Sequence, residues 1–142
     1  PEAESLDATQ LYSRVVLASI VEGEAKVASE RRRIAGVFFN RLNQGMRLES
    51  CATIQHLVGK PRAHLTLEDL RIESPYNTYL HEGLPPAPLS NPGIDSIAAA
   101  LDPEDTDFLF FVAREDGSGK HIFTRTFDSH QAAQQWIRRN DN

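Results

Sequence analysis

The chain has 142 residues and a mass of 15.9 kDa, which suits one compact domain over residues 1–142 with its own hydrophobic core. Hydrophobic residues make up 40% and charged residues 25%, a composition that excludes a largely disordered or fibrous protein. Fifteen Lys and Arg against 20 Asp and Glu give a net charge of −5, and this acidic balance argues against binding nucleic acid by charge.

The first third of the chain predicts two helices. Asp7 and Gln10 have the spacing of a capping pair, and apolar residues occupy nearly the whole circumference of the helix that follows over 11–21. We therefore expect this helix to be largely buried. A second helix is predicted from Val27 to Leu42, with Glu30 to Arg33 on its solvent side, and Gly45 ends it.

The middle of the chain predicts short helices and one long loop. Residues 51–58 suit a short helix, and Thr66 with Asp69 suits the start of another. Five prolines fall between residues 74 and 92, so we expect an ordered loop there rather than a helix or strand. Long loops in compact domains are often functional.

The last third mixes helix and strand. A helix is predicted over 94–101, a strand over 108–113, a turn over 114–120 and a returning strand over 121–124. Asp128 is expected to cap a terminal helix that carries Ala132, Ala133 and Trp136 on one side. The predicted fold class is α+β, with a helical front half, a small antiparallel hairpin and a C-terminal helix.

Two carboxylates, Glu22 and Glu24, come at the end of the first apolar helix. A carboxyl held against apolar walls has a raised pKa and can donate a proton near neutral pH. The alternative is that the glutamates lie at a solvated helix end and pair with the arginines at 31–33. Periodicity does not choose between Glu22 and Glu24.

Two further groups of polar side chains suit a ligand. Asn40 and Arg41 follow core aromatic residues and could bind a sugar or a carboxylate, or serve as a helix cap and a surface ion pair. Residues 76–79 place two tyrosines around an amide and a hydroxyl, a combination typical of carbohydrate clefts and also of packed loops.

Other motifs predict no cofactor and no metal. Residues 117–120 lack the earlier glycine and the following Ser or Thr of a phosphate loop. The histidines show no metal-ligand pair at helical spacing, and the single cysteine, Cys51, excludes a disulfide framework and is expected to be a small buried residue. No apolar stretch approaches the roughly 18 residues of a membrane span.

In this order, the segments resemble the catalytic domain of the YceG/MltG-like endolytic murein transglycosylases. The resemblance covers roughly residues 17 to 137 and is carried by residues 18–25 (ASIVEGEA), 27–50, 52–57, 74–103, 108–113 and 121–130. Many relatives read Ser/Thr-Asp-Pro-Thr-x-x-Tyr where this chain has SCATIQH at 50–56, so the Asp, Pro and Tyr of that pattern are absent.

The resemblance implies a function and a set of site residues. It assigns the catalytic acid/base role to Glu24, supported by Glu22, Glu30 and His121. It implies that the substrate is bound by Asn40, Arg41, Ser50, Thr53, Gln55, Tyr76, Asn77, Thr78 and Tyr79. It also implies that the partner is the glycan strand of peptidoglycan, together with the cell-wall synthesis machinery. An extracytoplasmic location is implied too, with an N-terminal membrane helix and a LysM-like region in the longer protein.

The expected reaction cleaves the bond between N-acetylmuramic acid and N-acetylglucosamine without water and leaves a 1,6-anhydro end. It needs one acid/base residue, and we find no obvious second acid in the sequence. The alternatives are a lysozyme-type hydrolase on the same glycan and a peptidoglycan-binding module without catalytic activity.

Overall fold

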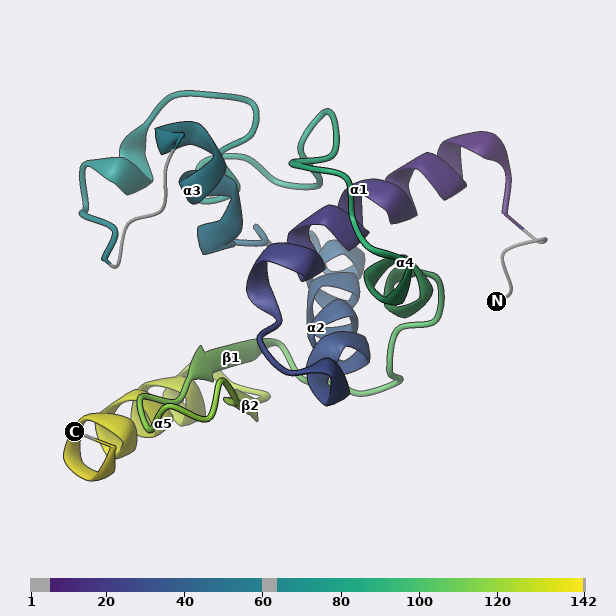
Figure 1. Ribbon diagram of the computed structural model, residues 1–142. Coiled ribbons are helices and arrows are strands. Elements are labelled where there is room, and N and C mark those ends of the chain that lie inside the picture. The colour runs from purple at the N-terminus through teal and green to yellow at the C-terminus, as the bar shows by residue number, and fades with distance from the viewer. Residues whose placement is uncertain (1–5, 60–63, 142) are drawn as a thin grey trace.

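The computed structural model describes residues 6–59 and 64–141, and among them it contains five α-helices and one two-stranded antiparallel sheet. This confirms the α+β fold class, and Figure 1 shows the arrangement. In chain order the elements are α1 (Ala8–Glu24), the 3₁₀ turn η2 (Ala28–Glu30), α2 (Arg31–Asn43), α3 (Cys51–Val58), the 3₁₀ turn η3 (Asp69–Arg71), α4 (Ile94–Leu101), β1 (Phe110–Ala113), β2 (His121–Thr124) and α5 (Phe127–Asn140).

The core lies in a helical layer made of α1, α2 and α4. Asp7 and Gln10 form the predicted reciprocal capping box at the start of α1. The prediction of a largely buried α1 holds only for its C-terminal half, because Val16 to Val21 are buried while Leu11 and Tyr12 are 40% and 50% exposed. The buried half is the part that α2 and α4 contact, so it carries the packing of the layer.

The backbone at Glu104, after α4, passes very close to α2. A Cβ at Gly36 would lie 2.5 Å from the backbone oxygen of Glu104, so only glycine fits. The expectation that Glu30 lies on the solvent side is wrong: it is 8% exposed and faces the hairpin. The neighbouring arginines lie on the solvent side instead. They form ion pairs with acids that follow the proline-rich loop: Arg31 with Asp95, Arg32 with Asp102 and Arg33 with Glu104.

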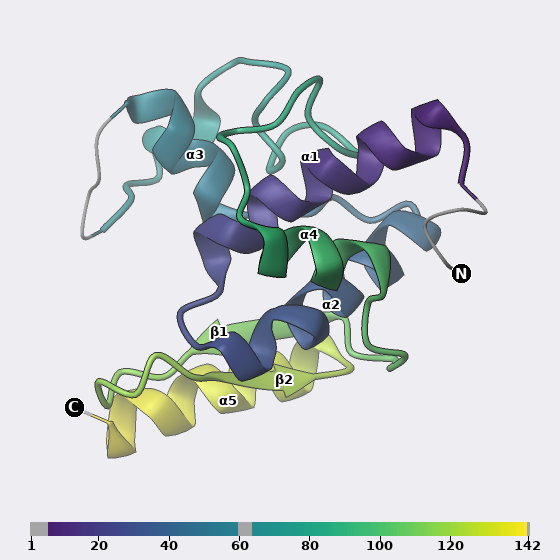
Figure 2. The same ribbon diagram turned by 45° about the vertical axis from the view of Figure 1, so that its right-hand side comes forward.

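The hairpin unit consists of β1, β2 and α5. Phe111 of β1 pairs with Phe123 of β2, and the tight turn between the strands uses two glycines with positive φ, Gly117 and Gly119. Two strands alone are marginally stable. Figure 2 shows the hairpin between α2 on one side and α5 on the other, and both helices contact it.

The terminal helix begins earlier than predicted. Thr126, and not Asp128, is the N-cap residue of α5, and its hydroxyl accepts a hydrogen bond from the Ser129 N–H. The buried residue of α5 is Ile137, whereas Trp136 is 42% exposed and lies under the guanidinium of Arg114.

The proline-rich segment is an ordered loop, as predicted, because the structure has no helix or strand over 74–92. Its anchor is Asn77, which is fully buried: its amide nitrogen donates to the carbonyls of Leu70 and Ile72, and its amide oxygen accepts from the Tyr79 N–H. The helix expected to start at Thr66 is only the single turn η3. Within the described ranges, no helix is long and apolar enough to cross a membrane.

Candidate active site

A cleft of about 420 Å³ lies between the helical layer and the hairpin unit. Its walls come from two helices of the layer (Glu24 at the end of α1 and one face of α2) and from the hairpin unit (β1, His121 of β2 and the first half of α5). The remaining lining residues are Leu48, Glu49, Cys51, Tyr79 and Leu109. The volume is in the range of small-ligand sites, and phenylalanines on β1 and α5 supply apolar surface on which a sugar ring can pack.

Glu24 is the acid of α1 that reaches this cleft, and its carboxylate is held on one side only. Oε2 accepts a hydrogen bond from the Ser50 hydroxyl at 2.5 Å and one from the Ala52 N–H at 3.3 Å. Ser50 is the N-cap of α3, so the carboxylate lies at the end of α3 where backbone N–H groups point outward. No described residue donates a hydrogen bond to Oε1, which leaves this oxygen for a ligand.

A close approach of α1 and α3 brings the donors to Glu24. The Cβ of any side chain at Gly23 would lie 2.8 Å from the Cβ of Ala52, closer than two carbons can approach. The glycine between the two glutamates therefore has a structural reason. It allows α3 to pack against the last turn of α1, so that Ser50 and Ala52 can reach Glu24.

Glu22 lies outside the cleft and acts on the fold. Its Oε1 accepts hydrogen bonds from the Gly93 N–H at 3.0 Å and the Ser96 hydroxyl at 2.8 Å. Gly93 is the N-cap residue of α4 and Ser96 lies in its first turn, so Glu22 ties the start of α4 to the end of α1. The hydrogen bond from Gly93, followed by that from Ser96, lowers the pKa of Glu22. The structure thus distinguishes the two glutamates, which periodicity could not: Glu24 lines the cleft and Glu22 contacts the start of α4.

Asn40 and Arg41 hold the chain that leads into β1. The Asn40 amide donates to the carbonyls of Thr106 and Phe108, and its side chain does not line the cleft. Arg41 does line the cleft, but its guanidinium is buried and donates to the carbonyls of Leu109 and Arg47. Burial lowers the pKa of Arg41, with Glu49 acting in the opposite direction.

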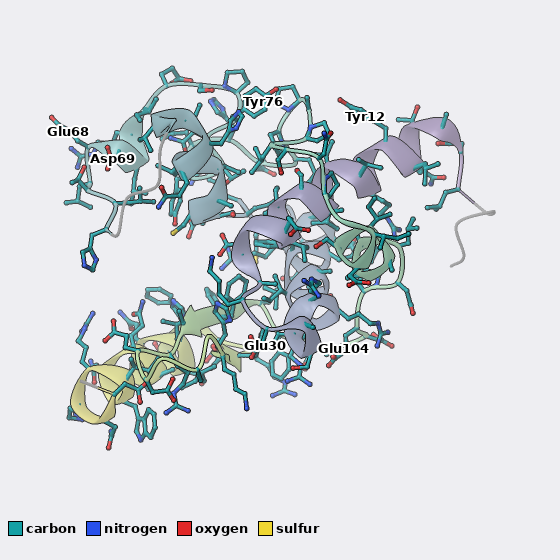
Figure 3. All side chains as sticks on the ribbon, viewed as in Figure 1. Tyr12, Glu30, Glu68, Asp69, Tyr76 and Glu104 are labelled. Atoms are coloured by element: carbon teal, nitrogen blue, oxygen red, sulfur yellow. The ribbon has the colours of Figure 1, made fainter. Side chains whose placement is uncertain are left out.

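The other predicted binding residues serve mainly to position the site. Thr78 accepts a hydrogen bond from the Ser50 N–H and pairs with the hydroxyl of Thr53, so this buried pair fixes the N-terminus of α3. Tyr76 packs against the ring of His56 on α3 and lies far from Glu30 (Figure 3). Of these predicted binding residues, Tyr79 lines the cleft. The others do not: Thr53, Gln55, Tyr76, Asn77 and Thr78.

Tyr79 and Cys51 meet on the cleft wall. The tyrosine oxygen and the cysteine sulfur are 3.3 Å apart. Burial raises the pKa of the Tyr79 phenol well above its ordinary value, and burial also raises the pKa of the Cys51 thiol, with the charge of Glu24 adding to the effect. The expectation of a small buried Cys51 is wrong: the residue as a whole is exposed, although its sulfur lies at the cleft wall against Tyr79.

Sequence reasoning missed several residues of the cleft. Glu49 is a second acid on the cleft wall, and it is the non-glycine residue with positive φ (50°) in the described chain. Strained backbone of this kind clusters at functional sites. His130 of α5 stacks on Phe110, and burial lowers its pKa. His121 and Glu30, predicted to support the site, are hydrogen-bonded to each other, and His121 lines the cleft.

Comparisons with known proteins show which family the sequence belongs to. The profile of a family described as YceG-like matches residues 2–136. The chain is 39% identical over 125 residues to a protein of Bacillus subtilis (strain 168) named endolytic murein transglycosylase, covering 88% of this chain. It is 36% identical over 121 residues to a protein of the same name from Streptococcus pneumoniae (strain D39), covering 82% of this chain.

A solved structure has the same fold. The crystal structure of a yceG-like protein from Listeria monocytogenes superposes with a TM-score of 0.81 at 41% sequence identity and covers 87% of this chain. All of these proteins are longer: the chain spans 34% of the Bacillus protein, 22% of the Streptococcus protein and 40% of the Listeria chain.

Proposed function

The chain belongs to the YceG-like family, and on this premise we propose that it is the catalytic part of a peptidoglycan lytic transglycosylase that acts outside the cytoplasm. The name endolytic murein transglycosylase on its relatives supports this function. The observation that carries the proposal is the state of Glu24, a carboxyl in a cleft with Oε2 bonded to Ser50 and Ala52 and Oε1 open to a ligand.

The proposed reaction uses Glu24 twice. Protonated Glu24 gives its proton to the glycosidic oxygen between N-acetylmuramic acid and N-acetylglucosamine, the bond from C1 to that oxygen breaks, and positive charge develops at C1. The carboxylate then takes the proton of the muramoyl C6 hydroxyl while the C6 oxygen bonds to C1. The products are a 1,6-anhydro end and a free hydroxyl on the other sugar, and no water is consumed.

The surrounding residues support this cycle by orientation. The Ser50 hydroxyl donates to Glu24 Oε2, which stabilises the carboxylate that forms after the first proton transfer. The raised pKa of Tyr79 keeps its phenol protonated, so it can donate to a sugar oxygen. The phenylalanines of β1 cover apolar sugar faces and reduce the water near C1.

The test is digestion of murein by the protein and by Glu24→Gln, with mass spectrometry of the products. The glutamine oxygen can still accept from Ser50 and Ala52, so the variant should keep its fold. It cannot donate and recover a proton in the same way, and turnover should fall at least about a hundredfold. Undiminished cleavage by Glu24→Gln would contradict the assignment. Binding without product by both proteins would favour a binding module.

Hydrolysis is a second candidate function because Glu49 places another carboxylate on the cleft wall. Two acids on either side of a glycosidic bond are the usual arrangement of hydrolases. The products separate the reactions, since an anhydro end is about 18 mass units lighter than a hydrolysed end, the mass of one water. Transglycosylation predicts anhydro ends and an active Glu49→Gln variant, whereas hydrolysis predicts neither.

A further inference from the structure

Glu30 and His121 form a pair in which one side of the imidazole is fully used. Oε1 of Glu30 is 2.8 Å from Nδ1 of His121, and Oε2 accepts the backbone N–H of the same residue at 3.0 Å. The side chains are 5% and 10% exposed for His121 and Glu30. A carboxylate accepts hydrogen bonds, so the contact requires a hydrogen on Nδ1. In that tautomer of an imidazole, the lone pair is on Nε2.

The packing of the ring leaves it little freedom. The imidazole lies edge-on to Phe111, with 5.1 Å between the ring centroids and an angle of 88°. Glu30 belongs to η2 and His121 to β2, so the pair also joins the helical layer to the hairpin unit. The orientation of the ring is thus set from two sides before any ligand binds, which lowers the entropic cost of using it.

Nε2 is the part of the ring without a partner. No hydrogen bond joins it to any described residue, although His121 lines the same cleft as Glu24. Burying a carboxylate carries a desolvation penalty, and apolar residues of similar volume would stabilise the attachment of the hairpin as well or better. It is a good way to fix the tautomer of a histidine whose second nitrogen contacts a ligand.

We propose that His121 binds the glycan through Nε2, which accepts a hydrogen bond from a sugar hydroxyl next to the bond that Glu24 attacks. Glu30 is the positioning residue that fixes the ring and its tautomer. This inference rests on the proposed function, because it takes the ligand of the cleft to be a glycan strand.

The experiment measures binding of uncross-linked glycan strands to the Glu24→Gln protein, which holds the ligand without consuming it. His121→Asn keeps an amide where Nδ1 lies, so it preserves the bond to Glu30 and removes Nε2. One neutral hydrogen bond corresponds to a rise in Kd of about threefold to tenfold. His121→Gln, whose amide reaches the position of Nε2, is the matched control and should recover part of the affinity.

A second measurement observes the ring of His121 directly. Two-bond proton–nitrogen NMR spectra of the histidine rings should show His121 protonated at Nδ1 only, with its signal assigned by its absence from His121→Asn. Addition of glycan should shift the Nε2 resonance and leave Nδ1 almost unchanged. The spectrum decides the question even if His121→Asn unfolds, since assignment can then use backbone correlations.

The outcomes separate this inference from the proposed function. A folded His121→Asn protein with unchanged Kd, or an Nε2 resonance that glycan does not move, overturns the role of His121 and leaves cleavage by Glu24 untouched. Binding through Nε2 by a protein that releases no product from murein would instead overturn the catalytic function and retain the glycan contact.

Discussion

Gly23→Ala should affect activity far more than stability. The new Cβ would lie 2.8 Å from the Ala52 Cβ, whereas carbons in contact lie about 3.5–4.0 Å apart, so α1 and α3 must separate by about 0.7–1.2 Å. Alanine in a helix gains up to about 1 kcal/mol over glycine, which offsets part of an overpacking cost of about 1–3 kcal/mol. With a gain of about 0.5–1 kcal/mol against this cost, the unfolding free energy should fall by at most about 2.5 kcal/mol.

The effect on Glu24 has nothing to offset it. A displacement of about 1 Å lengthens the 3.3 Å contact from the Ala52 N–H and disturbs the Ser50 hydrogen bond, and misplacement on this scale costs about a hundredfold in rate. The assay is release of soluble glycan from murein, with thermal unfolding in parallel.

The control restores the space from the other side. In Gly23→Ala with Ala52→Gly, the nearest remaining atom is the Cα of residue 52 at 3.9 Å, an ordinary contact. Activity should return to near the original level. Normal turnover by Gly23→Ala alone, or no recovery in the double variant, would refute the reasoning.

Three further outcomes are expected. Ser50→Ala removes a hydrogen bond to a charged group, so murein cleavage should fall about tenfold or more, with a loss of about 1 kcal/mol in unfolding free energy from the missing cap. Because the pKa of Glu22 is lowered, its carboxylate contributes to folding stability above the ordinary pKa of 4.5, and this stability is lost as the pH falls below that value. Calorimetry should therefore show that Glu22→Gln lowers the melting temperature at pH 7 and much less at pH 3. The raised pKa of Cys51 predicts that its thiol is alkylated more slowly at pH 8 than a free thiol. Glu24→Gln removes a negative charge near the thiol and should speed the alkylation, so equal rates in the two proteins would contradict an effect of Glu24 on Cys51.

The sequence predicted the elements that depend on local signals. The capping pair at Asp7, the glycine after α2 and the hairpin around residues 114–120 use interactions within a few residues, and all three are present. The predictions that failed concern residues whose burial is determined by segments distant in the sequence. The burial of Glu30 depends on His121, which is 91 residues away, and no periodicity within α2 contains that information.

The site divides in the same way. Spacing brought two glutamates to the end of one helix, but the choice between them depends on Gly93, Ser50 and Ala52 from other parts of the chain. Glu49 was missed because a positive φ at a glutamate leaves no trace in composition or periodicity. The tyrosines and the asparagine of the proline-rich loop have side chains that suit a sugar. The Asn77 amide, however, already makes hydrogen bonds to backbone groups through both its nitrogen and its oxygen.

The cleft has two walls of separate origin. The wall with Glu24 depends on α1 and α3, while Phe127, His130 and Gln134 of the opposite wall belong to the last helix. Substitutions on that helix can widen, narrow or recharge the groove without moving the acid. Under the proposed function, changes on α5 should therefore alter the length or decoration of the glycan strands that are accepted without altering the acid, and a designer seeking altered selectivity should vary α5 first.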